Sequence, residues 1–109
     1  LSVGHDSSAA EHIAELVPGA RVVKAFNTVS VKAMADPLFS GERATLFYCG
    51  DDVDAKQIVH QLAEDLGFEP LDAGPRHVAR FLEPFAMLYI HLAVHEKWGS
   101  NFAFKLIRR

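Results

Sequence analysis

Three short apolar runs divide this chain and constrain its fold more than any other feature. The runs are Val22–Phe26, Ala44–Cys49 and Phe68–Leu71, and each ends at a turn of polar or glycine residues. The sequence between the runs has the apolar spacing of helices. Because the first run has almost no alternation of apolar and polar residues and the second has no polar face, we expect covering layers on both sides of each strand, as in parallel sheets. The sequence therefore predicts an α/β fold with about three parallel strands in three layers.

Signals for helix starts and stops lie between these runs. Ser8 and Glu11 have the spacing of a capping box, which predicts a helix that begins at Ser8 and ends at Pro18-Gly19. A shorter helix is expected over residues 30–35. Proline, serine and glycine punctuate residues 37–43, which are therefore expected to form a surface loop.

The clearest helical pattern follows the second run. Asp51 or Asp52 can cap this helix, and Gly67 is expected to end it. Its apolar residues recur on one face: Ala55, Ile58, Val59, Leu62 and Leu66. The third run follows directly, and Pro70 marks it as an edge strand or a strand end.

The segment Val78–Val94 predicts a long apolar helix near the C-terminus. Of its 17 residues 13 are apolar, and they surround the whole helical circumference. Pro84 predicts a kink or a restart near Glu83, and Gly99 is expected to close the helix. A helix that is apolar all round must be covered on all sides, by the rest of its domain or by a partner subunit. We therefore expect a homo-oligomer.

Composition limits the classes of partner and compartment. The chain of 109 residues is long enough for one domain, residues 1–109, and its net charge of −3 gives no basic stripe for nucleic acid. No apolar run reaches the roughly 18 residues that cross a membrane, so no membrane partner is expected. The lone cysteine, Cys49, fits a reducing cytoplasm, where we expect the protein to act.

The turns after the apolar runs are the candidate site. Ligands of parallel α/β sheets bind beyond the carboxyl ends of the strands, which draws attention to the turns Asn27-Thr28, 50–52 and 72–75. The amide of Asn27 and the hydroxyl of Thr28 can contact a polar ring substituent such as a carboxamide. Alternatively, Asn27 caps the turn, and Thr28 or Ser30 caps the following helix.

The turn at residues 72–75 has a second pair of candidates. Gly74 and Pro75 let the backbone approach a planar ligand closely, and Asp72 or Arg76 can bind its polar rim. An ordinary connection from a strand to a helix needs the same residues, so both interpretations stay open.

Three further groups favour structural roles. Arg80 and Glu83 are three residues apart, which predicts an ion pair more readily than a ligand contact. Cys49 has acidic neighbours that disfavour a thiolate, so a buried structural thiol is expected in place of a nucleophile. His91 and His95 have the spacing of metal ligands but lack a third, and we expect solvated or interface histidines.

Several segments, in their order along the chain, resemble one known family. They are Val22–Thr28, Cys49–Asp52, Pro70–Pro75, and Arg80 with Glu83-Pro84. This series is similar to the C-terminal half of the NADP oxidoreductases that use the deazaflavin coenzyme F-420. More loosely, it resembles the reductase domains of six-transmembrane metalloreductases. The resemblance covers essentially the whole chain, including its closing segment Phe102–Arg109.

The resemblance implies an incomplete Rossmann-like domain and a redox function. Family members bind NADP(H) and pass a hydride to a deazaflavin or flavin-type partner, which implies cofactor contacts at Phe26, Asn27, Thr28, Gly74 and Pro75. We assign no catalytic residue, because hydride transfer depends on the positioning of two rings. We expect no metal site.

The start of the chain bears on the same question. The chain begins at Leu1 and contains neither G-x-G-x-x-G nor G-x-x-x-x-G-K-[ST], so we expect it to be the second half of such a domain. Two alternatives remain: a non-catalytic oligomerisation module derived from such a reductase, and a small-molecule binder without redox turnover.

Overall fold

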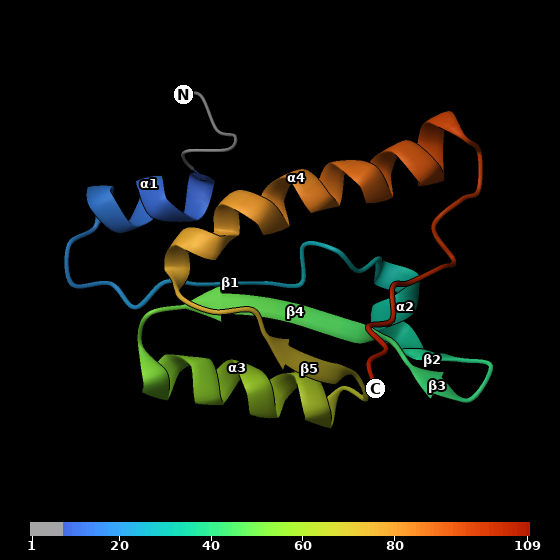
Figure 1. Ribbon diagram of the computed structural model, residues 1–109, viewed down its shortest axis with the longest axis horizontal. Coiled ribbons are helices and arrows are strands. Elements are labelled where there is room, and N and C mark those ends of the chain that lie inside the picture. The colour runs from blue at the N-terminus through green and yellow to red at the C-terminus, as the bar shows by residue number, and fades with distance from the viewer. Residues whose placement is uncertain (1–7) are drawn as a thin grey trace.

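The computed structural model describes residues 8–109 as three layers. The central sheet contains β1 (Val23–Ala25), β4 (Thr45–Gly50) and β5 (Glu69–Asp72), in the order β1-β4-β5. Helices α1 (Ala9–Leu16) and α4 (Ala79–Ile90) cover one face, and α3 (Val53–Asp65) covers the other (Figure 1). The predicted α/β layering is confirmed.

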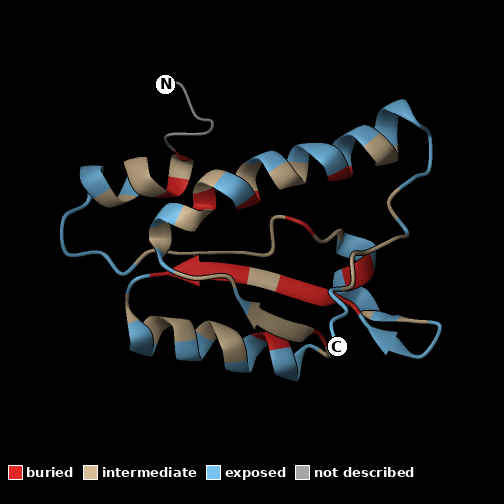
Figure 2. Cartoon of the chain, in the orientation of Figure 1, coloured by how far each residue is buried: buried red, intermediate tan, exposed pale blue. Residues whose placement is uncertain are grey.

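β4 supplies the centre of both cores. Its alternate residues Leu46 and Tyr48 point to one face, where they join Phe68 in the larger buried cluster. Phe47 and Cys49 point to the other face, where Cys49 is buried with Ala10, Ala79 and Leu82 of the two covering helices. The strand is therefore buried along nearly its whole length, as Figure 2 shows. This explains why the run has no polar face.

The direction of β1 differs from the prediction. β4 and β5 are parallel, but β1 is antiparallel to β4, with Val23 opposite Gly50 and Ala25 opposite Tyr48. The prediction of three parallel strands is therefore wrong at β1. Mixed sheets of this kind are common, with an antiparallel strand at the edge.

The connection between β1 and β4 contains a short helix and a hairpin, and no helix long enough to cross the sheet. Its only helix is α2 (Val31–Ala35), whose five residues span about 7.5 Å at the usual rise. The six residues of β4 span about 20 Å. α2 alone is thus too short to carry the chain back along the sheet, and the chain enters β4 near the end at which it left β1.

The predicted boundaries of the first three helices are confirmed to within about two residues. Ser8 caps α1 by accepting a bond from the Glu11 N–H, and Ser30 caps α2 through the Ala33 N–H. Asp52 caps α3 through the Ala55 N–H. Gly67 follows α3 with a φ of +97°, a conformation that favours glycine and ends the helix.

The expected surface loop at residues 37–43 is a hairpin. β2 (Leu38–Phe39) and β3 (Glu42–Arg43) pair antiparallel. The two residues between them, Ser40 and Gly41, have φ values of 54° and 82°. Positive φ at both positions is typical of a tight two-residue hairpin turn. Serine is uncommon at the first of these positions, so the sequence did not predict the hairpin.

One long apolar helix over residues 78–94 is not found. A 3₁₀ turn, η1 (Arg76–Val78), precedes α4, and a π-helical turn, η2 (His91–His95), follows it. Pro84 lies inside α4 without ending it, so of the two predicted alternatives, a kink or a restart near Glu83, the restart is wrong. Gly99 has a φ of 75° and donates to the Ala93 carbonyl. Across residues 8–109, no helix has the length and apolar character needed to cross a membrane.

Candidate functional site

The predicted site residues lie at two ends of the sheet. Because β1 runs against β4 and β5, its exit turn at residues 26–28 lies at the opposite end from the turn at residues 72–75 (Figure 1). The structure brings Phe26, Asn27 and Thr28 together, and separately Gly74 and Pro75. The shared crevice expected for all five residues is not formed.

Phe26 breaks the alternation of β1. Val23, Ala25 and Phe26 all pack against the core cluster that contains Phe68, although Ala25 and Phe26 are consecutive. This requires a local reversal, and Phe26 has a φ of 62°, in the left-handed region that a bulky residue rarely adopts. Its ring contacts the edge of Phe68 at a centroid distance of 6.2 Å. The reversal turns the next residue towards the opposite face.

Asn27 uses this reversal to reach α4. Its Nδ2 donates to the Leu82 carbonyl at 2.6 Å. Its Oδ1 is buried, and no donor among residues 8–109 meets it. A buried acceptor without a donor costs about 1–3 kcal/mol, so such atoms are rare in native proteins. Two neighbouring residues are therefore unfavourable: Phe26 has a left-handed backbone conformation, and the Oδ1 of Asn27 lacks a hydrogen-bond donor.

The rest of this turn is packed in the ordinary way. Thr28 is 2% exposed. Ser30 caps α2, as one of the alternative interpretations predicted. Asn27 is left with a long-range contact, 55 residues along the chain, that sequence spacing could not indicate.

The turn at residues 72–75 satisfies its own polar groups. Gly74 has a φ of 124°; its N–H donates to Asp72 Oδ1 at 2.9 Å. Its carbonyl accepts bonds from the Gly50 N–H at 3.1 Å and from Lys56 Nζ at 3.2 Å. Pro75 is exposed and immediately precedes η1. The ordinary connection from strand to helix thus accounts for these residues, and their cofactor role stays a prediction.

The charged side chains around that turn bind other groups of the protein. Asp72 lies 2.8 Å from Lys56 Nζ, and Asp51 accepts the Arg76 backbone N–H at 2.7 Å. A hollow of about 120 Å³ lies beside it, with Tyr48 and Asp72 in its wall. Burial, and then the charge of Asp72, raise the pKa of Tyr48. The Tyr48 hydroxyl is 2.8 Å from His60 Nδ1.

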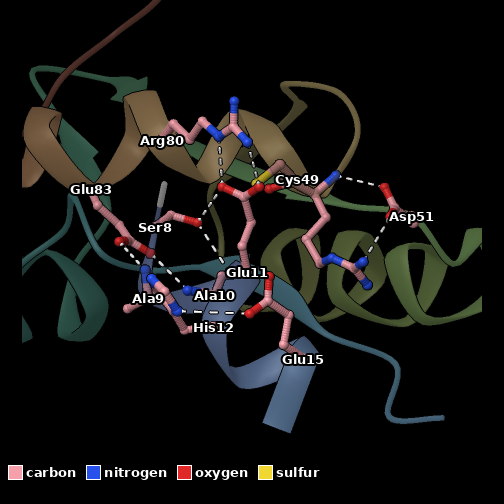
Figure 3. A network of polar contacts seen from close by, with 11 residues as sticks. Ser8, Ala9, Ala10, Glu11, His12, Glu15, Cys49, Asp51, Arg80 and Glu83 are labelled. Carbon is pink, nitrogen blue, oxygen red and sulfur yellow. Dashed lines mark hydrogen bonds and ion pairs between the residues drawn. The ribbon is translucent and has the colours of Figure 1, made fainter. Parts of the chain in front are cut away.

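Arg80 and Glu83 join α4 to other elements (Figure 3). Arg80 donates to both carboxylate oxygens of Glu11, at 2.9 and 3.0 Å, and this bond lowers the pKa of Glu11. Glu83 accepts the N–H groups of Ala9 and Ala10 at 2.7 and 3.1 Å. Both residues thus have structural roles, but their bonds run to α1, about 70 positions away in the chain, whereas their spacing predicted an ion pair with each other.

Cys49 is a structural thiol. The residue is fully buried, and burial raises the pKa of its thiol to about 11. His91 and His95 stack at a ring distance of 5.5 Å, and His91 pairs with Glu96 at 3.0 Å. Within residues 8–109, no group of three histidine, cysteine or acidic side chains is arranged to hold a metal ion.

No family model matches the chain, but individual relatives do. Metalloreductase STEAP3 of Rattus norvegicus is 43% identical over 72% of this chain. F420-dependent NADP reductase of Methanocaldococcus jannaschii is 30% identical over 84% of it. The chain is homologous to both reductases. This confirms the resemblance drawn from the ordered segments.

Solved structures agree with the sequence relatives. A chain described as a candidate F420-dependent NADP reductase of Arthrobacter sp. FB24 matches 97% of our chain, with a TM-score of 0.85 and 34% sequence identity. A hypothetical protein of Sinorhizobium meliloti has a TM-score of 0.57 and 42% identity over 64%. Our chain covers 41% of the length of the archaeal reductase, 16% of the metalloreductase and 48% of the Arthrobacter chain.

Proposed function

We propose that this chain forms the C-terminal part of an NADP-dependent oxidoreductase. In this proposal, hydride passes between NADP(H) and a deazaflavin acceptor such as coenzyme F-420, or a flavin-type acceptor. The observation that supports it most strongly is the match to the Arthrobacter reductase, at a TM-score of 0.85 over 97% of the chain. Sequence identity of 34% over the same length extends the match beyond the fold.

The proposed contribution of the chain is a wall beside the nicotinamide at residues 26–28. A carboxamide N–H is a suitable donor for the unsatisfied Oδ1 of Asn27. The nicotinamide, when bound, supplies the hydride chemistry, and the protein has to hold the two rings close and exclude water. The sequence has no glycine-rich phosphate cradle, so the proposed contact concerns the ring end of the dinucleotide.

Access to this acceptor has a cost. Asn27 Oδ1 is covered by protein atoms in this structure, so a ligand reaches it by displacing a neighbouring group. The free energy of that displacement is subtracted from the affinity. Binding at this turn is therefore expected to move the atoms that cover Asn27 Oδ1 and to leave the bond from Asn27 Nδ2 to the Leu82 carbonyl in place.

A chimera tests the proposed function directly. The chain would replace the matching 48% of the Arthrobacter reductase, and NADPH affinity and NADPH oxidation with F420 would be measured. We expect binding and hydride transfer, with the intact Arthrobacter protein as reference. A folded chimera that does not bind NADPH would contradict the proposal. Binding of NADPH without oxidation, with F420 or a flavin, would instead support a binder without redox turnover.

A homo-oligomer through α4 is a second proposal. Phe81 is 63% exposed and Met87 is 64% exposed, and Figure 2 shows exposed residues along the outer side of this helix. Further apolar residues of α4 and of the segment after it are also exposed: Leu88, Ile90, Val94 and Trp98. Apolar patches of this kind commonly mark interfaces, and we assign this one to a second copy of the chain. Sedimentation should show a dimer that Met87→Lys dissociates; a monomer at high concentration would contradict it.

A further inference from the structure

Two contacts tie β1 and its exit turn to successive residues of α4. Lys24 Nζ lies 3.6 Å from Glu83 Oε2, and Asn27 Nδ2 donates to the Leu82 carbonyl at 2.6 Å. β1 has only three residues, and within residues 8–109 its sole strand neighbour is β4. So short a strand is held weakly by its own ladder. The contacts with α4 therefore help to fix its exit turn, together with the packing of Phe26 against Phe68.

Glu83 is held from two directions. Its side chain is only 13% exposed, and it accepts the first N–H groups of α1 while pairing with Lys24 (Figure 3 shows its bonds to Ala9 and Ala10). A carboxylate is favoured at a helix N-terminus, and bonds to charged acceptors are short and strong. These contacts fix the position of Glu83 in α4, and with it that of the neighbouring Leu82 carbonyl.

The position of that carbonyl selects the orientation of the Asn27 amide. An asparagine side chain presents a donor at one end and an acceptor at the other, and rotation by half a turn exchanges them. With Nδ2 bonded to the Leu82 carbonyl, the acceptor Oδ1 is the end left for another partner. The turn is therefore set to receive an N–H donor.

We propose that Glu83 is a positioning residue for the turn at residues 26–28. By holding α4 against β1, it keeps the Asn27 amide in the orientation that presents an acceptor to a ligand with an N–H group, such as a carboxamide. The identity of that ligand rests on the proposed function. The orientation itself does not, since it is a property of the protein without ligand.

Nuclear magnetic resonance of the protein without ligand tests the orientation. We expect one proton of the Asn27 side-chain amide to be shifted downfield and to exchange slowly, because its bond to Leu82 is short. Glu83→Gln and Lys24→Met each remove the ion pair to β1 and should move this signal towards that of an exposed asparagine. Glu11→Gln removes a different contact between α1 and α4 and should leave the signal in place. An unchanged signal in both Glu83→Gln and Lys24→Met, or an equal change in Glu11→Gln, would overturn the proposal.

NADPH affinity of the chimera tests the consequence for a ligand. Glu83→Gln should weaken binding by about threefold to tenfold, the usual range for a residue that acts through another. Glu11→Gln should bind like the parent. Equal affinities of the parent and Glu83→Gln would overturn the role of Glu83 in ligand binding. A parent chimera that does not bind NADPH would refute the proposed function, and the resonance experiment would still decide the orientation.

Discussion

The turns at residues 26–28 and 72–76 look alike in the sequence and differ in the structure. Each follows an apolar run and contains small or polar residues. At residues 72–76, the N–H and C=O of Gly74 are both bonded within the protein. At residues 26–28, Phe26 has a left-handed backbone and Asn27 has a buried oxygen without a donor among residues 8–109. Strain and unmet bonding are typical of functional positions, so the first turn is the better candidate.

The largest effect is expected from Asn27→Asp. The substitution removes the donor to the Leu82 carbonyl and leaves a buried carboxylate facing it, which should lower the free energy of unfolding by about 2–4 kcal/mol. Urea unfolding measures the loss. Asn101→Asp is the matched control, because Asn101 is exposed. Equal stability of the two variants would show that the Asn27 contact contributes nothing.

Gly74→Ala tests the other turn. A side chain at a φ of 124° is strained, and the added Cβ would lie 3.2 Å from Val78 Cγ2, so a loss of about 1–3 kcal/mol is expected. Gly19→Ala is the control: its φ is 88°, but nothing lies within 4 Å of the added carbon. The difference between the two variants in urea measures the packing contribution. No difference would mean that backbone strain alone explains Gly74.

A smaller effect is expected from the pH dependence of stability at the Glu11–Arg80 ion pair, which links α1 and α4. Because the bond to Arg80 lowers the pKa of Glu11 in the folded state, Glu11 stabilises the fold above its unfolded pKa. That contribution is lost as pH falls through the folded pKa. Stability measured from neutral pH to about pH 3 should therefore fall more steeply for the parent than for Glu11→Gln. Parallel curves would contradict the assignment.

The smallest effect concerns Cys49. Burial raises the pKa of its thiol to about 11, so almost no thiolate forms at neutral pH. We expect slow labelling of the folded protein by an alkylating reagent and rapid labelling in urea. Fast labelling of the folded protein would indicate that the core beneath α4 opens readily.

The parts of the fold that depend on local chemistry were predictable from the sequence. Caps at Ser8, Ser30 and Asp52 involve atoms three residues apart; the sequence identified Ser8, and it named Ser30 and Asp52 each as one of two candidates. The apolar runs placed the strands to within one residue at Thr45–Gly50 and Glu69–Asp72. Burial on both faces of β4 also followed from its composition.

The parts that depend on distant contacts were not predictable. An apolar run does not reveal strand direction, so β1 was assigned the wrong one, although the short helix at residues 31–35 was a usable signal. The partners of Asn27, Arg80 and Glu83 lie 55 to 74 positions away. Sequence spacing selected these residues as candidates, but only the fold shows what they contact.

NADPH affinity of two chimera variants, measured side by side, tests the central claim most directly. The proposal is that the turn at residues 26–28 contacts the nicotinamide, and the competing prediction is that Gly74 and Pro75 at residues 72–76 contact it. Asn27→Ala should weaken NADPH binding by about tenfold, the value of one lost hydrogen bond of ordinary strength. Gly74→Ala, measured at a temperature where it is folded, should bind like the parent. If Gly74→Ala weakened NADPH binding and Asn27→Ala did not, the proposed contact at residues 26–28 would be contradicted.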